Sequence, residues 1–183
     1  LVQGNTAWSL STRANATTGL SDITRVSLGG SETVITDQIT TGQLGGYLEV
    51  RDDLIPAYQD SLDELAATLI SQVNALHETG YDLDGDTGVS FFTGTSASDI
   101  AVNSDILDDG GNIAASETAE GIPDDGAIAS AIAELQDSLL FSGSTSTAGD
   151  FYAALVSDVG AKVSSVESKY EAQESLVNTC QSQ

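Results

Sequence analysis

Two segments of this 183-residue sequence repeat apolar side chains every seven residues, and this periodicity limits the possible folds more than any other feature. Over 45–79 the repeat places leucine and isoleucine on one side of a helix, and over 148–183 it places valine and tyrosine there. A seven-residue repeat that lasts several turns is typical of helices that pack lengthwise against another helix. We call the two sets of side chains the first row (Leu48, Ile55, Leu62, Leu65, Leu69 and Leu76) and the second row (Tyr152, Val156, Val159, Val163, Val166 and Tyr170).

The two rows together predict a long-helix bundle with a coiled-coil-like packing seam, in which the first row packs against the second. A third, shorter helix is expected over 126–140, where apolar residues recur at helical spacing. Pro56 interrupts the first long helix, which therefore either kinks at 52–55 or begins there. Contact between subunits is the alternative role for the rows, but we expect most of this packing to lie within the chain.

The remaining residues predict a β-rich part and an irregular part. Residues 1–43 contain alternating, β-branched runs with Gly29-Gly30 at a turn position, which indicates a small antiparallel meander. Residues 80–125 have neither period and are rich in Asp and Gly. The predicted fold class is therefore α+β, mainly α. We expect a β-rich segment of an inserted outer domain over 1–43 and a helical domain over 44–183.

The charge of the sequence excludes several classes of function. There are 28 acidic residues against 5 basic ones, a formal net charge of −23, and no Lys or Arg lies between Arg51 and Lys162. Nucleic acids and anionic membrane surfaces require basic patches, so neither is an expected partner. No apolar run approaches the roughly 20 residues of a membrane-spanning helix.

The search for catalytic or metal-binding residues yields one candidate turn. Asp82, Asp84 and Asp86 occupy alternate positions, as in a calcium-binding loop, although Thr87 and Thr93 stand where such a loop has Gly and Glu. An Asp-capped turn is the alternative interpretation. The single histidine, His77, has no nucleophile motif beside it, and we interpret it as a packing residue. No enzyme activity and no cofactor are predicted.

A set of ordered motifs resembles one known family. The segment Thr41-Gly-Gln-Leu-Gly-Gly-Tyr-Leu-Glu-Val-Arg-Asp-Asp53 is followed by Val73-Asn-Ala-Leu-His77, by Gly80-Tyr-Asp-Leu-Asp-Gly85 and by Phe91-Phe92. Further along, Ala133-Glu-Leu-Gln136, Asp150–Gly160 and Glu171-Ala-Gln-Glu174 continue the same order. These motifs resemble the flagellar hook-associated protein 1 family over most of residues 41–180. The acidic segment 103–126 and Cys180 depart from the family pattern.

The resemblance implies a non-catalytic structural protein of the bacterial flagellum, located outside the cell at the joint between hook and filament. It implies export through the flagellar secretion system, an export chaperone for the full-length protein, and assembly with the hook protein, a second junction protein and further copies in a ring. The sequence contains no Met and begins at Leu1, so we expect a fragment that lacks both terminal assembly regions. Alone, this fragment is expected to be monomeric.

Two other functions remain open from the sequence. A flagellin-like filament subunit would also place long helices along the flagellar axis. A calcium-dependent surface adhesin or binding module would use the Asp82–Asp86 turn.

Overall fold

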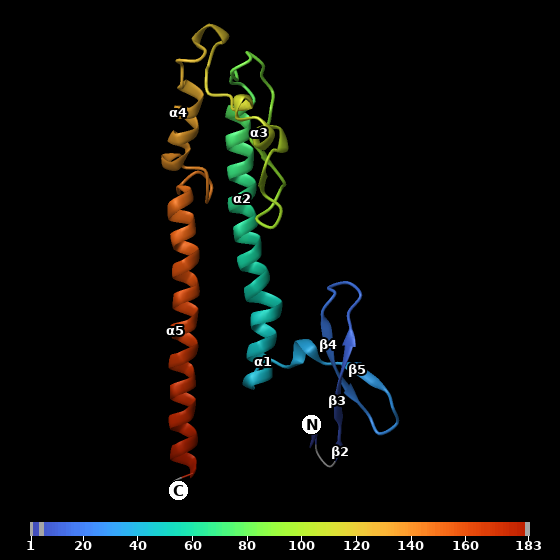
Figure 1. The fold of residues 1–183 in the computed structure, drawn as a ribbon. Coiled ribbons are helices and arrows are strands. Elements are labelled where there is room, and N and C mark those ends of the chain that lie inside the picture. The colour runs from blue at the N-terminus through green and yellow to red at the C-terminus, as the bar shows by residue number, and fades with distance from the viewer. Residues whose placement is uncertain (1, 4–5, 182–183) are drawn as a thin grey trace. The chain divides into compact units, whose positions relative to one another are not determined.

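A computed structural model describes residues 2–3 and 6–181 (Figure 1). The chain divides into two compact units, Leu1–Ala57 and Tyr58–Gln183. The division lies inside a helical stretch, whereas the sequence predicts a domain boundary after residue 43. That domain boundary stays a prediction, and each unit is described here by itself.

The first unit contains the predicted antiparallel sheet. Strands β3 (Ser9–Ala14), β4 (Ser21–Val26) and β5 (Glu32–Val34) pair in the order β3-β4-β5, while β1 (Val2–Gln3) and β2 (Thr6–Ala7) form a separate pair. Gly30 makes the turn between β4 and β5 with a φ of 83°, a left-handed conformation that glycine adopts without steric cost. The meander expected for residues 1–43 is therefore present.

The helical stretch after the sheet begins with the 3₁₀ turn η1 (Thr36–Gln38) and α1 (Gly42–Glu49), and then passes through the π-helical turn η2 (Val50–Leu54). The π turn comes just before Pro56, which has no N–H to donate to the carbonyl group four residues earlier. Leu48 of α1 packs with Ile23 and Ile35 of the sheet side to form the buried core of this unit. This first-row residue therefore lies in the core of the β-rich unit.

The second unit consists of long helices and a folded irregular segment. Helix α2 (Ile55–His77) is followed by the strand pair β6 (Phe92–Thr93) and β7 (Ala101–Val102), by α3 (Ser104–Asp108), and by the 3₁₀ turns η3 (Gly110–Asn112) and η4 (Ala119–Gly121). Helix α4 (Ala127–Glu134) continues into η5 (Leu135–Asp137), and α5 (Ala148–Gln181) completes the described chain. Figure 1 shows α4 and α5 following one another beside α2.

The predicted helices agree with the structure except at some ends. Helical backbone runs from Gly42 to His77, where the sequence predicted 45–79, and α5 closely matches the predicted 148–183. The helix predicted over 126–140 ends earlier, because Ser138 has an extended backbone (φ −77°, ψ 137°). The mainly α, α+β fold class is confirmed.

Candidate functional site

The second row on α5 is uncovered in this chain. The exposed fractions of its six side chains range from 38% for Val159 to 67% for Tyr170. On α2, the first-row residue Leu62 is 37% exposed and Leu65, Leu69 and Leu76 are partly buried. Packing of the first row against the second therefore stays a prediction, and the surface of α5 is the main candidate for a functional contact.

Helices α2 and α5 meet through a different face of α5, which adjoins the second row. Phe151, Leu155 and Lys162 are partly buried; of these, Lys162 contacts α2, and Phe151 stacks on Phe141. Tyr58 Oη donates to Asp158 Oδ2 over 3.3 Å, and Lys162 Nζ lies 5.3 Å from the centroid of the Tyr58 ring. Asp158 also pairs with Lys162 at 3.0 Å, and this hydrogen bond raises the pKa of Lys162 above its ordinary value. Each of these face residues precedes a second-row residue by one position.

The start of α5 is fixed by a capping box and a stacked aromatic pair. Thr147 Oγ1 accepts the Asp150 N–H at 3.1 Å, and Asp150 Oδ2 accepts the Thr147 N–H at 3.4 Å, which is the reciprocal pattern of a capping box at a helix N-terminus. Phe141, which is almost fully buried, stacks on Phe151 with ring centroids 4.9 Å apart. These contacts define where the exposed helix leaves the folded part of the unit.

His77 is a buried structural residue that connects α2 to the irregular segment. Its side chain has no exposed surface, its Nδ1 lies 2.7 Å from the Val89 carbonyl oxygen, and its Nε2 accepts the Ala114 N–H at 2.9 Å. This arrangement assigns the ring proton to Nδ1. Both ring nitrogens bond to backbone, which agrees with the interpretation of His77 as a packing residue.

Asn74, one turn before His77, also connects α2 to the irregular segment through hydrogen bonds to its backbone, a role that the sequence analysis missed. Its Nδ2 donates to the Phe92 carbonyl oxygen and its Oδ1 accepts the Phe92 N–H, both over 2.8 Å. The Asn74 side chain thus provides hydrogen-bond partners for both the N–H and the carbonyl group of Phe92 in β6. The available signal was the pair of polar residues Asn74 and His77 on one helix face, just before a segment with no period of its own.

The aspartates of the irregular segment act as acceptors for backbone N–H groups. Asp82, which is buried, accepts the N–H groups of Asp84 and Asp86 through Oδ1 at 3.0 and 2.9 Å. This is the Asp-capped turn that was one of the two interpretations of Asp82, Asp84 and Asp86. Among the described residues, no group of three or more His, Cys, Asp or Glu side chains is arranged to hold a metal ion.

Asp99 and Asp125 have the same role in two further turns. The N–H of Thr95 bonds to Asp99, and those of Glu117 and Ala127 bond to Asp125 at 2.7 and 2.9 Å. These hydrogen bonds hold the pKa of both carboxyl groups below the ordinary value, because they favour the ionised form. Asp125 lies just before α4, and its Oδ1 accepts the N–H of Ala127, the first residue of that helix.

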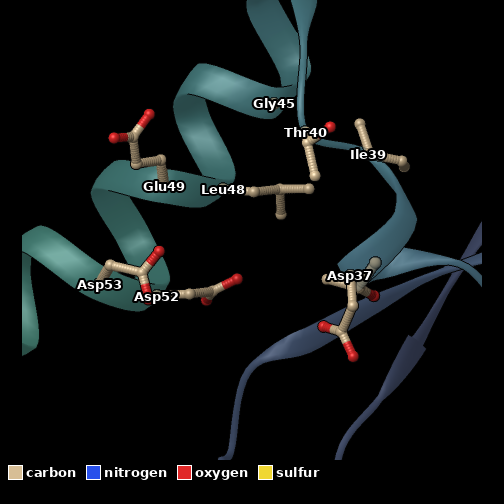
Figure 2. A pocket seen from close by; sticks show the side chains of 9 residues that line it. Asp37, Ile39, Thr40, Gly45, Leu48, Glu49, Asp52 and Asp53 are labelled. Carbon is tan, nitrogen blue, oxygen red and sulfur yellow. The ribbon is translucent and has the colours of Figure 1, made fainter.

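The first unit contains an acidic pocket of about 330 Å³ between η1 and α1. Figure 2 shows Leu48 extending toward Ile39 and Thr40, with the side chains of Asp37, Glu49, Asp52 and Asp53 around it. Beside the pocket, Arg51 bonds to both carboxylate oxygens of Asp52 and to the Ser21 carbonyl oxygen, so it ties the helical stretch to the sheet. Four carboxylates and two threonine hydroxyl groups therefore line this pocket.

None of the helices in the described part of the chain is long and apolar enough to span a membrane.

Comparison with known proteins gives concordant matches. A family model described as the helical domain of flagellar hook-associated protein FlgK matches residues 1–92, half of the chain. Flagellar hook-associated protein 1 of Salmonella typhimurium and that of Salmonella typhi are each 33% identical over 99 residues. Each match covers 51% of this chain and 17% of the relative, so the matched part is about a sixth of the relatives' length.

Proposed function

This chain belongs to the family of the flagellar hook-associated protein FlgK, and on that premise we propose that it is a structural part of the bacterial flagellar axis that joins hook to filament. The match over residues 1–92 carries the proposal, because it includes the sheet, α1, α2 and the His77 contact. The relatives' printed name, flagellar hook-associated protein 1, supports the same role.

The proposed mechanism is mechanical and non-catalytic. Helix α5 has 34 residues, which corresponds to a length of about 50 Å at 1.5 Å per residue. A helix of this length can carry load between neighbouring polymers along an axis. The single histidine supports a non-catalytic role, because both of its ring nitrogens are engaged with backbone.

The proposed partners and location follow from membership of the family. We infer that the protein contacts other axial proteins, namely the hook protein, a second junction protein and further copies in a ring, and that a chaperone accompanies the full-length chain before export. The proposed location is outside the cell, after passage through the flagellar secretion system. The strongly acidic surface supports solubility before assembly.

Immunogold electron microscopy of the producing cells, with an antibody raised against this chain, tests the proposal. We expect gold particles at the joint between hook and filament. Labelling along the whole filament would indicate a flagellin-like subunit instead. Labelling over the cell body would contradict an axial role and favour a surface adhesin.

A further inference from the structure

Three exposed apolar side chains lie in the irregular segment between α2 and α4. Leu83 is 60% exposed, Leu107 is 72% exposed and Ile113 is 43% exposed, and we call these three residues the apolar cluster. Single apolar side chains are common on protein surfaces, whereas several in one region indicate an interaction site. We propose that the apolar cluster is a docking site for a segment of another protein that carries basic and apolar side chains side by side. The proposal does not depend on the flagellar role.

Hydrogen bonds hold the parts of the apolar cluster in one region of the fold. The Leu83 N–H donates over 3.1 Å to the carbonyl oxygen of Gly111, which lies in η3 directly before the third member of the cluster. Asn112 Nδ2 donates over 2.8 Å to the Asp105 carbonyl oxygen, and so ties η3 to α3, the helix that carries Leu107. Because these contacts fix the surface before a partner arrives, little conformational entropy is lost on binding.

Helix α3 buries one apolar residue and exposes the next. Ile106 is 6% exposed, and Leu107 follows it at a rotation of about 100° around the helix axis. Asn103 caps this short helix, because its side chain accepts the Asp105 N–H at 3.2 Å. Ile106 therefore supplies the core contact of α3, and Leu107 is available for contact with a partner.

The surroundings of the apolar cluster are acidic. The exposed aspartates within three positions of a cluster residue are Asp84, Asp86, Asp105, Asp108 and Asp109. No Lys or Arg occurs between Arg51 and Lys162, so the irregular segment contains no basic side chain to neutralise them. Apolar groups among carboxylates fit a partner that supplies cationic and apolar side chains together. The charges attract such a partner, and its apolar side chains remove the cluster from water.

Partners of other chemistry fit this surface less well. A nucleic acid or an anionic lipid would meet the aspartates as like charges. A purely apolar partner would take carboxylates out of water without pairing them, which is costly. A metal ion is not favoured, because no group of three or more His, Cys, Asp or Glu side chains is arranged to hold one in the described ranges 2–3 and 6–181.

Titration of the whole 183-residue chain with labelled peptides tests the proposal. The probe is a short peptide of alternating lysine and leucine. Two peptides of equal length are the controls: one alternates lysine with serine, and the other alternates glutamate with leucine. At ~0.15 M salt, fluorescence anisotropy should give a dissociation constant for the lysine–leucine peptide at least about tenfold lower than for either control, because the surface requires both properties.

Two serine variants test where the peptide binds. Leu107→Ser removes the most exposed side chain of the apolar cluster and should weaken binding of the lysine–leucine peptide by about tenfold. Val166→Ser is the matched control, because Val166 is 63% exposed in the second row of α5, and it should leave the affinity unchanged. Since both side chains are mostly exposed, both variants should melt at the wild-type temperature.

Two charge variants test the role of the aspartates. Asp84→Asn combined with Asp108→Asn should weaken binding of the same peptide by about fivefold and make the affinity less dependent on salt. Glu64→Gln combined with Glu134→Gln removes the same charge from exposed positions outside the cluster, and it should change the affinity by less than about twofold. This comparison leaves every apolar side chain in place, so it is independent of how Leu107→Ser folds.

Four results would overturn the proposal. Equal affinity for the lysine–leucine and lysine–serine peptides would show that charge alone attracts the peptide. A larger loss with Val166→Ser than with Leu107→Ser would place the binding on α5. Equal losses in the two charge variants would show that net charge, and not the aspartates near the cluster, is responsible. No binding at ~1 mM peptide would show that the cluster is not a docking site.

Discussion

At the scale of single residues, the neighbouring glycines 45 and 46 of α1 meet different surroundings. A Cβ atom on Gly45 would lie 2.8 Å from the Thr40 carbonyl carbon, whereas one on Gly46 would have nothing within 4 Å. We expect Gly45→Ala to lower the free energy of unfolding by ~1–3 kcal/mol, because backbone must move. Gly46→Ala should raise it by ~1 kcal/mol through helix propensity. Urea unfolding followed by the fluorescence of Trp8, the chain's only tryptophan, reports on this unit. Effects of the same sign would contradict the expectation.

Asp125 should contribute to the loss of stability in acid. A carboxyl group whose pKa is lower in the folded than in the unfolded chain stabilises the fold above the unfolded value, and this contribution disappears as the pH falls through the folded value. The pKa of Asp125 lies below the ordinary 3.8, so Asp125→Asn should lower the melting temperature at neutral pH. The difference from wild type should shrink below about pH 4.

Melting curves from about pH 2 to 7 measure this difference. Asp124→Asn is the matched control, because the side chain of Asp124 makes no hydrogen bond among those the structure describes, and it should change the neutral melting temperature little. A difference between wild type and Asp125→Asn that stays constant down to the lowest pH would disprove the role of the ionised carboxylate.

At the scale of secondary-structure elements, the capping box at Thr147 should stabilise the start of α5. Thr147→Ala removes the hydroxyl group that accepts the Asp150 N–H and should cost about 1 kcal/mol. Thr147→Ser keeps the hydroxyl group and should cost less than half as much. Urea unfolding followed by circular dichroism at 222 nm provides the comparison. Equal losses in both variants would mean that the methyl group, and not the cap, is responsible.

The sequence predicted the elements better than it predicted their contacts. The seven-residue rows and Pro56 located the long helices, since these signals are local in the chain. They did not show which side of α5 faces α2. Phe151 and Leu155 lie next to the second row, so the apolar surface of α5 is wider than the row itself, and two adjacent faces of the helix are almost equally suitable for packing against another helix. The contacts of Asn74 and His77 with Phe92, Val89 and Ala114 depend on how a segment without periodicity folds back, and no local pattern encodes that.

At the scale of the whole molecule, the uneven charge should make stability depend on salt. The 110 positions between Arg51 and Lys162 contain acidic residues and no lysine or arginine, so their mutual repulsion favours unfolding. We expect the melting temperature to rise by ~5 °C between ~0.02 and ~0.3 M sodium chloride as this repulsion is screened. Replacing Glu64, Glu120 and Glu134, which are exposed, with Gln should raise the melting temperature at low salt and reduce the increase. A melting temperature that is independent of salt would contradict this account.

The hydrogen bond between Tyr58 and Asp158 joins residues 100 positions apart in the chain. Closing a loop of that length costs about 4 kcal/mol in chain entropy, while each helix and the His77 contacts form over much shorter separations. We therefore expect α5 to dock against α2 last during folding and to detach first in the native ensemble. Hydrogen exchange at low protein concentration should show the amides of α5 beyond Lys162 exchanging faster than those of α2. A helix that detaches and returns on its own gives the protein a movable arm, which can change neighbours without unfolding the rest of the molecule.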